Sequence, residues 1–206
     1  MKRVLILDLD NTIYPVKSIS ENLFAQLFKL VDDNTDELTA TKAKEELTRR
    51  PYQHVADEFG FSAELKEKGM QLLRNATYEQ PMQAYPEYDR LRAINADKFL
   101  VTTGFTKLQH SKVKMLGIND DFKKVYVVDP ELSKINKGDV FQQIMMDNGY
   151  VVEEMLVIGD DPQSEIKFAN ELGIDTFLFD PDNKYPEAPV TYRAIDYRDV
   201  AGIVNQ

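Results

Sequence analysis

Short apolar runs that end in polar residues constrain the fold of this chain more than any other feature. They occupy residues 4–7, 99–101, 125–128, 155–158 and 176–179, and their composition is typical of strands buried on both faces of a sheet. Between the later runs, apolar residues recur at helical spacing, as at Val140, Ile144 and Met145. Strands that alternate with helices in this way predict an α/β fold, a Rossmann-like parallel sheet with helices on both faces. A weak last strand is expected near residues 192–195, before a short final helix.

The stretch between residues 18 and 82 has a different pattern. Leucines and phenylalanines stand there among many charged residues, and no run resembles a buried strand. We therefore predict a small α-helical insertion after the first strand, with Pro15 and the segment 81–86 as its hinges. This divides the chain into an α/β core of residues 1–16 and 83–206 and a helical unit of residues 17–82.

Polar residues that can carry chemistry follow three of the apolar runs. Asp8 and Asp10 follow the first run, Thr102 the second and Asp160 the fourth. The carboxyl ends of parallel strands share one edge of a sheet, so these residues are expected to converge there. Converging carboxylates repel one another and need a counter-charge, and Mg²⁺ is a hard cation that prefers such oxygen ligands. The sequence therefore predicts a magnesium site at this edge.

The same residues suit phosphoryl transfer. Asp8 can act as the nucleophile, Asp10 can protonate the leaving alcohol and later activate water, and Thr102 can donate a hydrogen bond to a phosphate oxygen. An aspartate after a strand is often only a turn or capping residue. The spacing of two between Asp8 and Asp10, together with Gly-Asp after a later strand, favours the functional interpretation.

These motifs resemble those of the haloacid dehalogenase-like (HAD) hydrolase superfamily, in the same order along the chain. The first motif stands here as Val4-Leu5-Ile6-Leu7-Asp8-Leu9-Asp10-Asn11-Thr12, the second as Phe99-Leu100-Val101-Thr102 followed by Thr103-Gly104, and the fourth as Gly159-Asp160-Asp161-Pro162-Gln163-Ser164-Glu165. The resemblance implies an aspartyl-phosphate on Asp8, and Mg²⁺ held by Asp8, Asp160 and the backbone carbonyl of Asp10. It also implies that the helical insertion is a cap over the site.

Two positions depart from the family's commoner pattern. The second acid of the fourth motif is Glu165 rather than aspartate, and it is expected at the metal site, where it would contact a metal-bound water or a metal ligand. Asp161 beside Asp160 either contacts a metal-bound water or opens the following helix. The third motif needs a lysine, for which Lys134 and Lys137 are both candidates; Lys137 is favoured because Lys137-Gly138 resembles the Lys-Gly form of the motif. Residues expected to contact substrate are Asn11, Thr103, Gly104 and Lys134.

The acid at Asp10 suits phosphate esters, whose leaving groups need a proton. The resemblance therefore implies a Mg²⁺-dependent phosphatase of a small phosphorylated metabolite, either a nucleoside monophosphate or a sugar phosphate. The extended first motif, Asp8 to Pro15, is similar to that of pyrimidine nucleotidases. A sugar phosphomutase shares every one of these residues and remains an alternative. A phospho-accepting regulatory module, like a receiver domain, is disfavoured because such modules lack paired aspartates and a helical lid.

Composition excludes several other classes. The formal net charge of −10 disfavours nucleic-acid binding. The chain has no cysteine and only two histidines, so thiolate chemistry and multi-histidine metal sites are excluded. No stretch approaches the ~20 apolar residues of a membrane span, and the amino-terminal apolar run is too short for a secretory signal. We expect a cytoplasmic protein, either a monomer or a homodimer.

Overall fold

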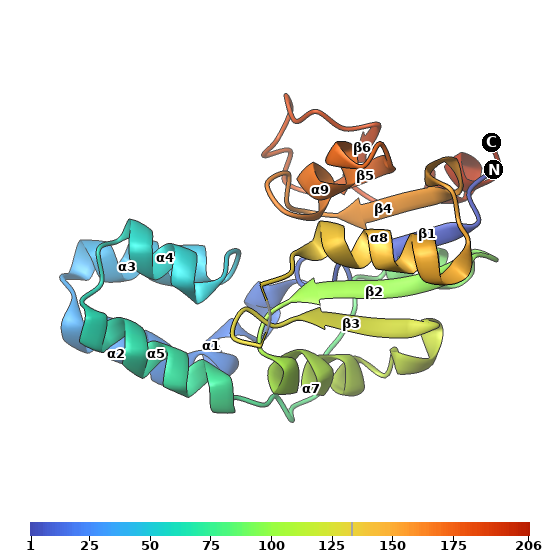
Figure 1. Ribbon diagram of the computed structural model, residues 1–206. Helices are drawn as coiled ribbons and strands as arrows, with labels where there is room; N and C mark the ends of the chain where they lie inside the picture. The colour runs from blue at the N-terminus through green and yellow to red at the C-terminus, as the bar shows by residue number, and fades with distance from the viewer. Residues whose placement is uncertain (133) are drawn as a thin grey trace.

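The computed structural model describes residues 1–132 and 134–206. A six-stranded sheet forms its centre (Figure 1), with the strand order β3-β2-β1-β4-β5-β6 and parallel pairing throughout. The strands are β1 (Val4–Leu7), β2 (Asp97–Thr103), β3 (Lys124–Val128), β4 (Met155–Gly159), β5 (Asp175–Phe179) and β6 (Tyr192–Ala194). All five apolar runs lie within strands, which confirms the predicted α/β class, and the weak last strand is β6.

Helices cover both faces of this sheet. Alternate residues of β1 enter different clusters: Val4 and Ile6 pack on one face, and Leu5 and Leu7 on the other. The first face is covered by α8 (Lys137–Asn148) and α9 (Glu165–Glu171), and the second by α6 (Tyr88–Arg92), α7 (Thr106–Leu116) and α10 (Val200–Val204). Burial on both faces explains why the central strands are continuously apolar. Short 3-10 helices occupy Val16–Ser18, Asn119–Asp121 and Val152–Glu154.

Five helices form the insertion between β1 and β2. They are α1 (Ser20–Leu23), α2 (Ala25–Asn34), α3 (Glu37–Leu47), α4 (Tyr52–Glu58) and α5 (Ala63–Asn75). Asp36 and Ser62 accept hydrogen bonds from the first backbone N–H groups of α3 and α5, as capping residues do. Figure 1 shows these helices beyond the carboxyl end of the sheet. We refer to residues 20–75 as the helical insertion.

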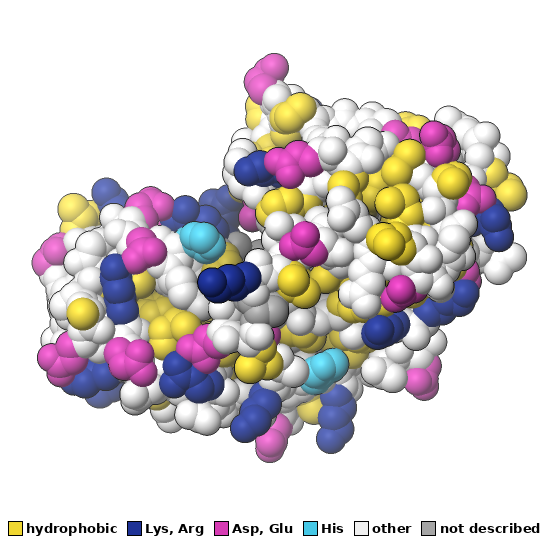
Figure 2. Space-filling model, viewed as in Figure 1, with side chains coloured by type: hydrophobic (Ala, Val, Ile, Leu, Met, Phe, Trp, Pro, Cys, Tyr) yellow, Lys and Arg dark blue, Asp and Glu magenta, His cyan; other side chains and the backbone are white. Residues whose placement is uncertain are grey.

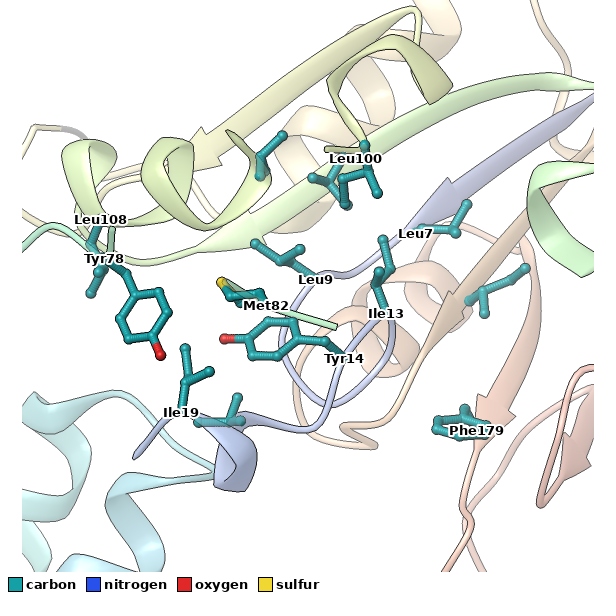
Figure 3. Close-up of a cluster of buried hydrophobic side chains, with 14 of the residues drawn as sticks. Leu7, Leu9, Ile13, Tyr14, Ile19, Tyr78, Met82, Leu100, Leu108 and Phe179 are labelled. Atoms are coloured by element: carbon teal, nitrogen blue, oxygen red, sulfur yellow. The ribbon is translucent and has the colours of Figure 1, made fainter. Parts of the chain in front are cut away.

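Apolar and polar contacts join the insertion to the sheet. One apolar cluster continues from Leu7 and Leu100 through Ile13 and Tyr14 to Ile19, where the insertion begins (Figure 3). Polar contacts lie around it: the Asn11 amide donates to the carbonyl of Thr48 at 3.3 Å, the Arg49 guanidinium donates to the Tyr185 hydroxyl at 2.5 Å, and Arg74 Nε donates to Glu131 at 2.6 Å. No helix in the described part of the chain is both long and apolar enough to span a membrane.

Candidate active site

A pocket of about 150 Å³ lies between the carboxyl end of the sheet and the helical insertion. Figure 2 shows the molecule hollowed between these two lobes, with Lys and Arg side chains at the rim. Five residues singled out from four separate parts of the sequence line this pocket: Asp8, Asp10, Thr102, Lys137 and Asp160. The parallel sheet brings them together because β1, β2 and β4 are neighbours that end at the same edge.

Asp8 and Lys137 form a buried ion pair at the centre of the site. The Asp8 carboxyl is 7% exposed, and its Oδ1 lies 2.7 Å from Lys137 Nζ. Burial raises the pKa of Asp8 to about 7 although Lys137 opposes the rise. Burial disfavours the ammonium of Lys137, but Asp8 and Glu165 outweigh it and raise the lysine's pKa, so Lys137 stays charged. Asp8 and Glu165 thus share one buried cation, the Lys137 ammonium.

Local sequence decides which lysine reaches the site. Asn136 and Asp139 form a reciprocal capping box that starts α8 at Lys137. Lys137 is therefore the first residue of the helix and is buried against Asp8, whereas Lys134 lies outside the helix and is exposed. Of the two candidates, Lys137 is the one that contacts the predicted nucleophile.

Carboxylates gather beside this pair. One oxygen from each of Asp8, Asp160 and Glu165 lies within 4.8 Å of the others. Burial raises the pKa of Asp160 well above its ordinary value, and the charges of Glu165 and Asp8 raise it further. Thr12 Oγ1 donates to Asp160 at 3.3 Å, the one side-chain donor to that carboxylate among the described residues. Lys137 sets one positive charge against these three carboxylates, and the negative charge that is left fits a divalent cation such as Mg²⁺.

Glu165 holds this cluster together. Its Oε2 accepts from Lys137 at 2.7 Å, and its Oε1 accepts from the backbone N–H of Asp161 at 2.8 Å. The side chain fits because residue 159 is glycine: a Cβ there would come within 2.0 Å of Glu165 Oε1. Asp161 itself accepts from the N–H of Gln163 in the turn before α9, and its pKa is raised by burial and then by Glu165.

Asp10 has a different environment from Asp8. Lys112 Nζ lies 2.9 Å from both Asp10 oxygens, the Tyr14 hydroxyl donates to Oδ1 at 2.5 Å, and Gln109 Nε2 donates to Oδ2 at 3.1 Å. Burial raises the pKa of Asp10, but Lys112, Tyr14 and Gln109 outweigh it, and the net pKa is lowered. The two aspartates of the first motif therefore have different electrostatic environments: burial dominates at Asp8, and the cation and hydrogen-bond donors dominate at Asp10.

A family model for haloacid dehalogenase-like hydrolases matches residues 2–173 of the chain. The chain belongs to this family. That match covers β1 through α9 and hence the motifs that carry Asp8, Thr102 and Asp160.

Curated relatives of this HAD-like hydrolase include two bacterial proteins. The pyrimidine 5'-nucleotidase PynA of Streptococcus pneumoniae is 28% identical over 125 residues, which is 57% of this chain and 51% of PynA. YfnB of Bacillus subtilis, named as a HAD-hydrolase, is 28% identical over 162 residues, 70% of this chain and 67% of YfnB. The chain thus spans about half the length of the first relative.

Solved structures of HAD proteins share the fold. The magnesium-bound crystal structure of YfnB superposes with a TM-score of 0.72 at 21% identity, covering 100% of this chain and 99% of that one. The HAD-like protein SP0104 of Streptococcus pneumoniae superposes with a TM-score of 0.74 at 18% identity, covering 98% of each chain. The L-2-haloacid dehalogenase of Xanthobacter autotrophicus superposes with a TM-score of 0.61 at 13% identity, covering 100% of this chain and 99% of that one. These likenesses establish the architecture of this HAD-like hydrolase.

The remaining predicted residues are placed as follows. Thr102, Thr103 and Gly104 line the pocket at the end of β2. Asn11 also lines it, but its amide is engaged by the protein: Oδ1 accepts from the N–H of Val16, and Nδ2 donates to the insertion. Asn11 has a left-handed backbone with φ of 57°, which asparagine tolerates better than most residues.

Sequence reasoning missed the polar partners of Asp10. Gln109 and Lys112 are three residues apart on α7, which starts directly after the second motif. That spacing places both on one face of the helix and could have marked them as a pair. Tyr14 is fully buried, and its hydroxyl also donates to Asp10.

Proposed function

We propose that this HAD-like hydrolase is a Mg²⁺-dependent phosphatase that acts through an aspartyl-phosphate on Asp8. The observation that carries this proposal is the pairing of the Asp8 carboxylate with Lys137 at 2.7 Å, beside the Asp160–Glu165 cluster in a pocket. This arrangement would supply a nucleophile (Asp8), a fixed cation (Lys137) and oxygen ligands for a metal cation in one place, and phosphoryl transfer requires all three.

In the first half-reaction, Asp8 attacks the phosphorus of the ester. The bond between phosphorus and the leaving oxygen breaks as the bond from Asp8 forms, and Asp10 gives its proton to the leaving oxygen, which departs as an alcohol. Lys137 and the Thr102 hydroxyl interact with the phosphoryl oxygens as negative charge builds on them.

In the second half-reaction, Asp10 takes a proton from a water molecule. The water oxygen attacks phosphorus, the bond to Asp8 breaks, and inorganic phosphate leaves while Asp8 recovers its carboxylate. Asp10 is now protonated again and ready for the next ester. The sum is one ester and one water converted to one alcohol and one phosphate.

Asp8 and Asp160 would hold Mg²⁺, with the backbone carbonyl of Asp10 and with Glu165 and Asp161 as further candidate contacts. When bound, the cation neutralises the carboxylate cluster and phosphate charge. The helical insertion would serve as the cap, because it covers the carboxyl edge of the sheet and its residues Leu47, Arg49 and Gln53 line the pocket. Such a cap excludes bulk water from the phosphoryl transfer.

A nucleoside monophosphate with a carbonyl-bearing base is the substrate class we favour. One relative carries the name pyrimidine 5'-nucleotidase. The pocket also has the matching chemistry, since apolar side chains such as Phe24, Leu27 and Leu108 line it together with Gln53. The Gln53 amide nitrogen is buried without a hydrogen-bond partner among the described residues, and a base carbonyl would supply one.

The test is a phosphatase assay with p-nitrophenyl phosphate and a panel of nucleoside and sugar phosphates, with MgCl₂ or with chelator. We expect activity that requires Mg²⁺ and falls at least about 10³-fold in Asp8→Asn, because the nucleophile is lost. Asp147→Asn, an exposed aspartate on α8, is the matched control and should keep full activity. Full activity in Asp8→Asn would refute the mechanism, and transfer of phosphate to a second hydroxyl instead of water would indicate a mutase.

A further inference from the structure

The Asp10 carboxylate already accepts as many hydrogen bonds as it can. Its two oxygens offer about four acceptor sites, and four contacts fill them: two from Lys112, one from Tyr14 and one from Gln109. One of these contacts must open before Asp10 can exchange a proton with a substrate. The geometry indicates which one.

Lys112 is committed to Asp10. Its side chain is only 3% exposed, and its Nζ lies 2.9 Å from both carboxylate oxygens. A buried ammonium is strongly destabilising unless it is paired, so this contact does not open easily. Tyr14 reinforces it with the shorter contact to Oδ1, from a fully buried ring. Oδ1 and the plane of the carboxylate are thereby fixed.

Gln109 holds the other oxygen less firmly. Its Nε2 lies 2.7 Å from Thr102 Oγ1, 3.2 Å from the Thr103 carbonyl and 3.1 Å from Asp10 Oδ2. An amide nitrogen has two hydrogens for these three acceptors, so the contact to Oδ2 can be given up while Gln109 stays satisfied. Oδ2 is the oxygen that can be released to the leaving group.

The same amide orients Thr102. Since Thr102 Oγ1 accepts from Gln109, its own hydrogen is free to donate to another oxygen. Gln109 is buried, and it packs over Gly104, where a Cβ would lie 3.1 Å from its side chain. Gly104 has φ of +151°, a conformation that also favours glycine. The second motif therefore has the shape that lets Gln109 reach both Thr102 and Asp10.

We propose that Lys112 and Gln109 are positioning residues for the acid/base and phosphate-binding groups, an inference that rests on the proposed phosphatase function. Lys112 fixes Asp10 with Oδ2 directed to the leaving oxygen. Gln109 yields Oδ2 to that oxygen and keeps the Thr102 hydroxyl directed to phosphate. Oδ2 carries the proton that passes to the leaving oxygen as its bond to phosphorus breaks, and Oδ2 later takes the proton from the attacking water.

The decisive test compares two leaving groups in Lys112→Met. An alkyl phosphate such as uridine 5'-monophosphate needs a proton on its leaving oxygen, whereas the nitrophenolate of p-nitrophenyl phosphate leaves readily without one. We expect kcat for the alkyl ester to fall about 10–100-fold, because a mispositioned acid transfers its proton less efficiently. We expect kcat for the aryl ester to fall less than about fivefold, because its leaving group needs no proton. Equal losses on both esters would overturn the role of Lys112.

A double-variant series separates positioning from structural damage. In an Asp10→Asn background, Lys112→Met should add almost no further loss, because the group that it positions is already gone. Lys112→Arg keeps the charge and should lose less than Lys112→Met, with the same preference for the aryl ester. Lys114→Met on the exposed side of α7 is the control and should match the wild-type protein. A full additional loss in the Asp10→Asn background would contradict the proposal.

Gln109→Met gives a different signature and an independent check. Without the amide, the Thr102 hydroxyl loses its orientation, so KM should rise about 3–10-fold for both esters, and inorganic phosphate should inhibit more weakly, as expected for one lost hydrogen bond. If Lys112→Met does not fold, Lys112→Arg and Gln109→Met decide the question. If Asp8→Asn keeps full activity, the phosphatase proposal itself fails. If Asp8→Asn is inactive but Lys112→Met affects the alkyl and aryl esters equally, only the positioning role fails.

Discussion

Single residues carry the substrate preference that we propose. Gln53 stands near the start of α4 and lines the pocket, and its amide nitrogen is buried without a partner in the described part of the chain. An unpaired buried donor costs about 1–3 kcal/mol. A half-turn of the amide exchanges its donor and acceptor, so it can bind a base that presents either a carbonyl or an N–H group.

Gln53→Met keeps the length of the side chain and removes the amide. We expect kcat/KM for uridine 5'-monophosphate to fall about 5–10-fold, because one buried hydrogen bond is lost, while kcat/KM for p-nitrophenyl phosphate stays within about twofold. Gln71→Met on the exposed side of α5 is the control. Steady-state kinetics with both substrates measure the difference; the same loss on both esters, or no loss on either, would contradict a role in base recognition.

At the scale of elements, close packing of α4 on α5 depends on one glycine. Gly69 lies inside α5, and a Cβ there would come within 2.2 Å of the ring of Tyr52 on α4. That ring is 4% exposed, and its hydroxyl donates to the carbonyl of Leu65 at 2.8 Å, so it has little room to move. Glycine is normally unfavourable within a helix, and here close packing accounts for it.

Gly69→Ala and Gly202→Ala should therefore change stability in opposite directions. Gly69→Ala should lower the free energy of unfolding by about 1–3 kcal/mol through overpacking. Gly202 lies inside α10 with open space around it, so Gly202→Ala should raise that free energy by about 0.5–1 kcal/mol. Urea titrations of both variants measure the two effects. A stabilised Gly69→Ala variant would show that α4 and α5 do not pack as described.

For the molecule as a whole, the buried carboxylates link folding to protons and to the metal. The pKa of Asp8 rises from 3.8 to about 7 on folding, chiefly through burial, and that of Asp160 rises in the same direction for the same main cause. A carboxyl group with a raised pKa binds more protons in the folded than in the unfolded state, so the metal-free protein loses stability as the pH rises through this interval. Carboxyl groups whose pKa is lowered, such as Asp10, change the free energy of unfolding only below about pH 3.8, their ordinary pKa. They therefore contribute little to the pH dependence of stability near neutral pH.

In the presence of chelator, the unfolding temperature should fall as the pH is raised from 5 to 7.5. The expected size is several degrees, since about 1 kcal/mol corresponds to about 2–4 °C for a chain of this size. Addition of MgCl₂ should raise the unfolding temperature and remove most of the pH trend, because a cation that binds the folded state stabilises it. Differential scanning calorimetry gives both quantities. Asp160→Asn should flatten the trend in chelator; an unchanged slope in that variant would place its origin elsewhere.

Much of the core could be predicted from the sequence because its signals are local. The apolar runs predict β1 to β5, and the rule that parallel strands end at one edge predicts that Asp8, Thr102 and Asp160 meet. The choice between Lys134 and Lys137 was also within reach, since Asn136 and Asp139 have capping-box spacing. The proposed boundaries at residues 17 and 83, and the role of the insertion as a cap, remain predictions.

The parallel sheet, the order of the motifs and the residues at the carboxyl edge could all be predicted from the amino-acid sequence, because strand patterns and motifs are properties of neighbouring residues. The folded structure was needed to show that Lys112 and Gln109 face Asp10, that Glu165 binds Lys137, and that Gln53 reaches the pocket. These contacts join segments far apart in the chain. They depend on the rotation and position of each helix on the sheet. Packing of the whole core determines both, and no local sequence pattern encodes them.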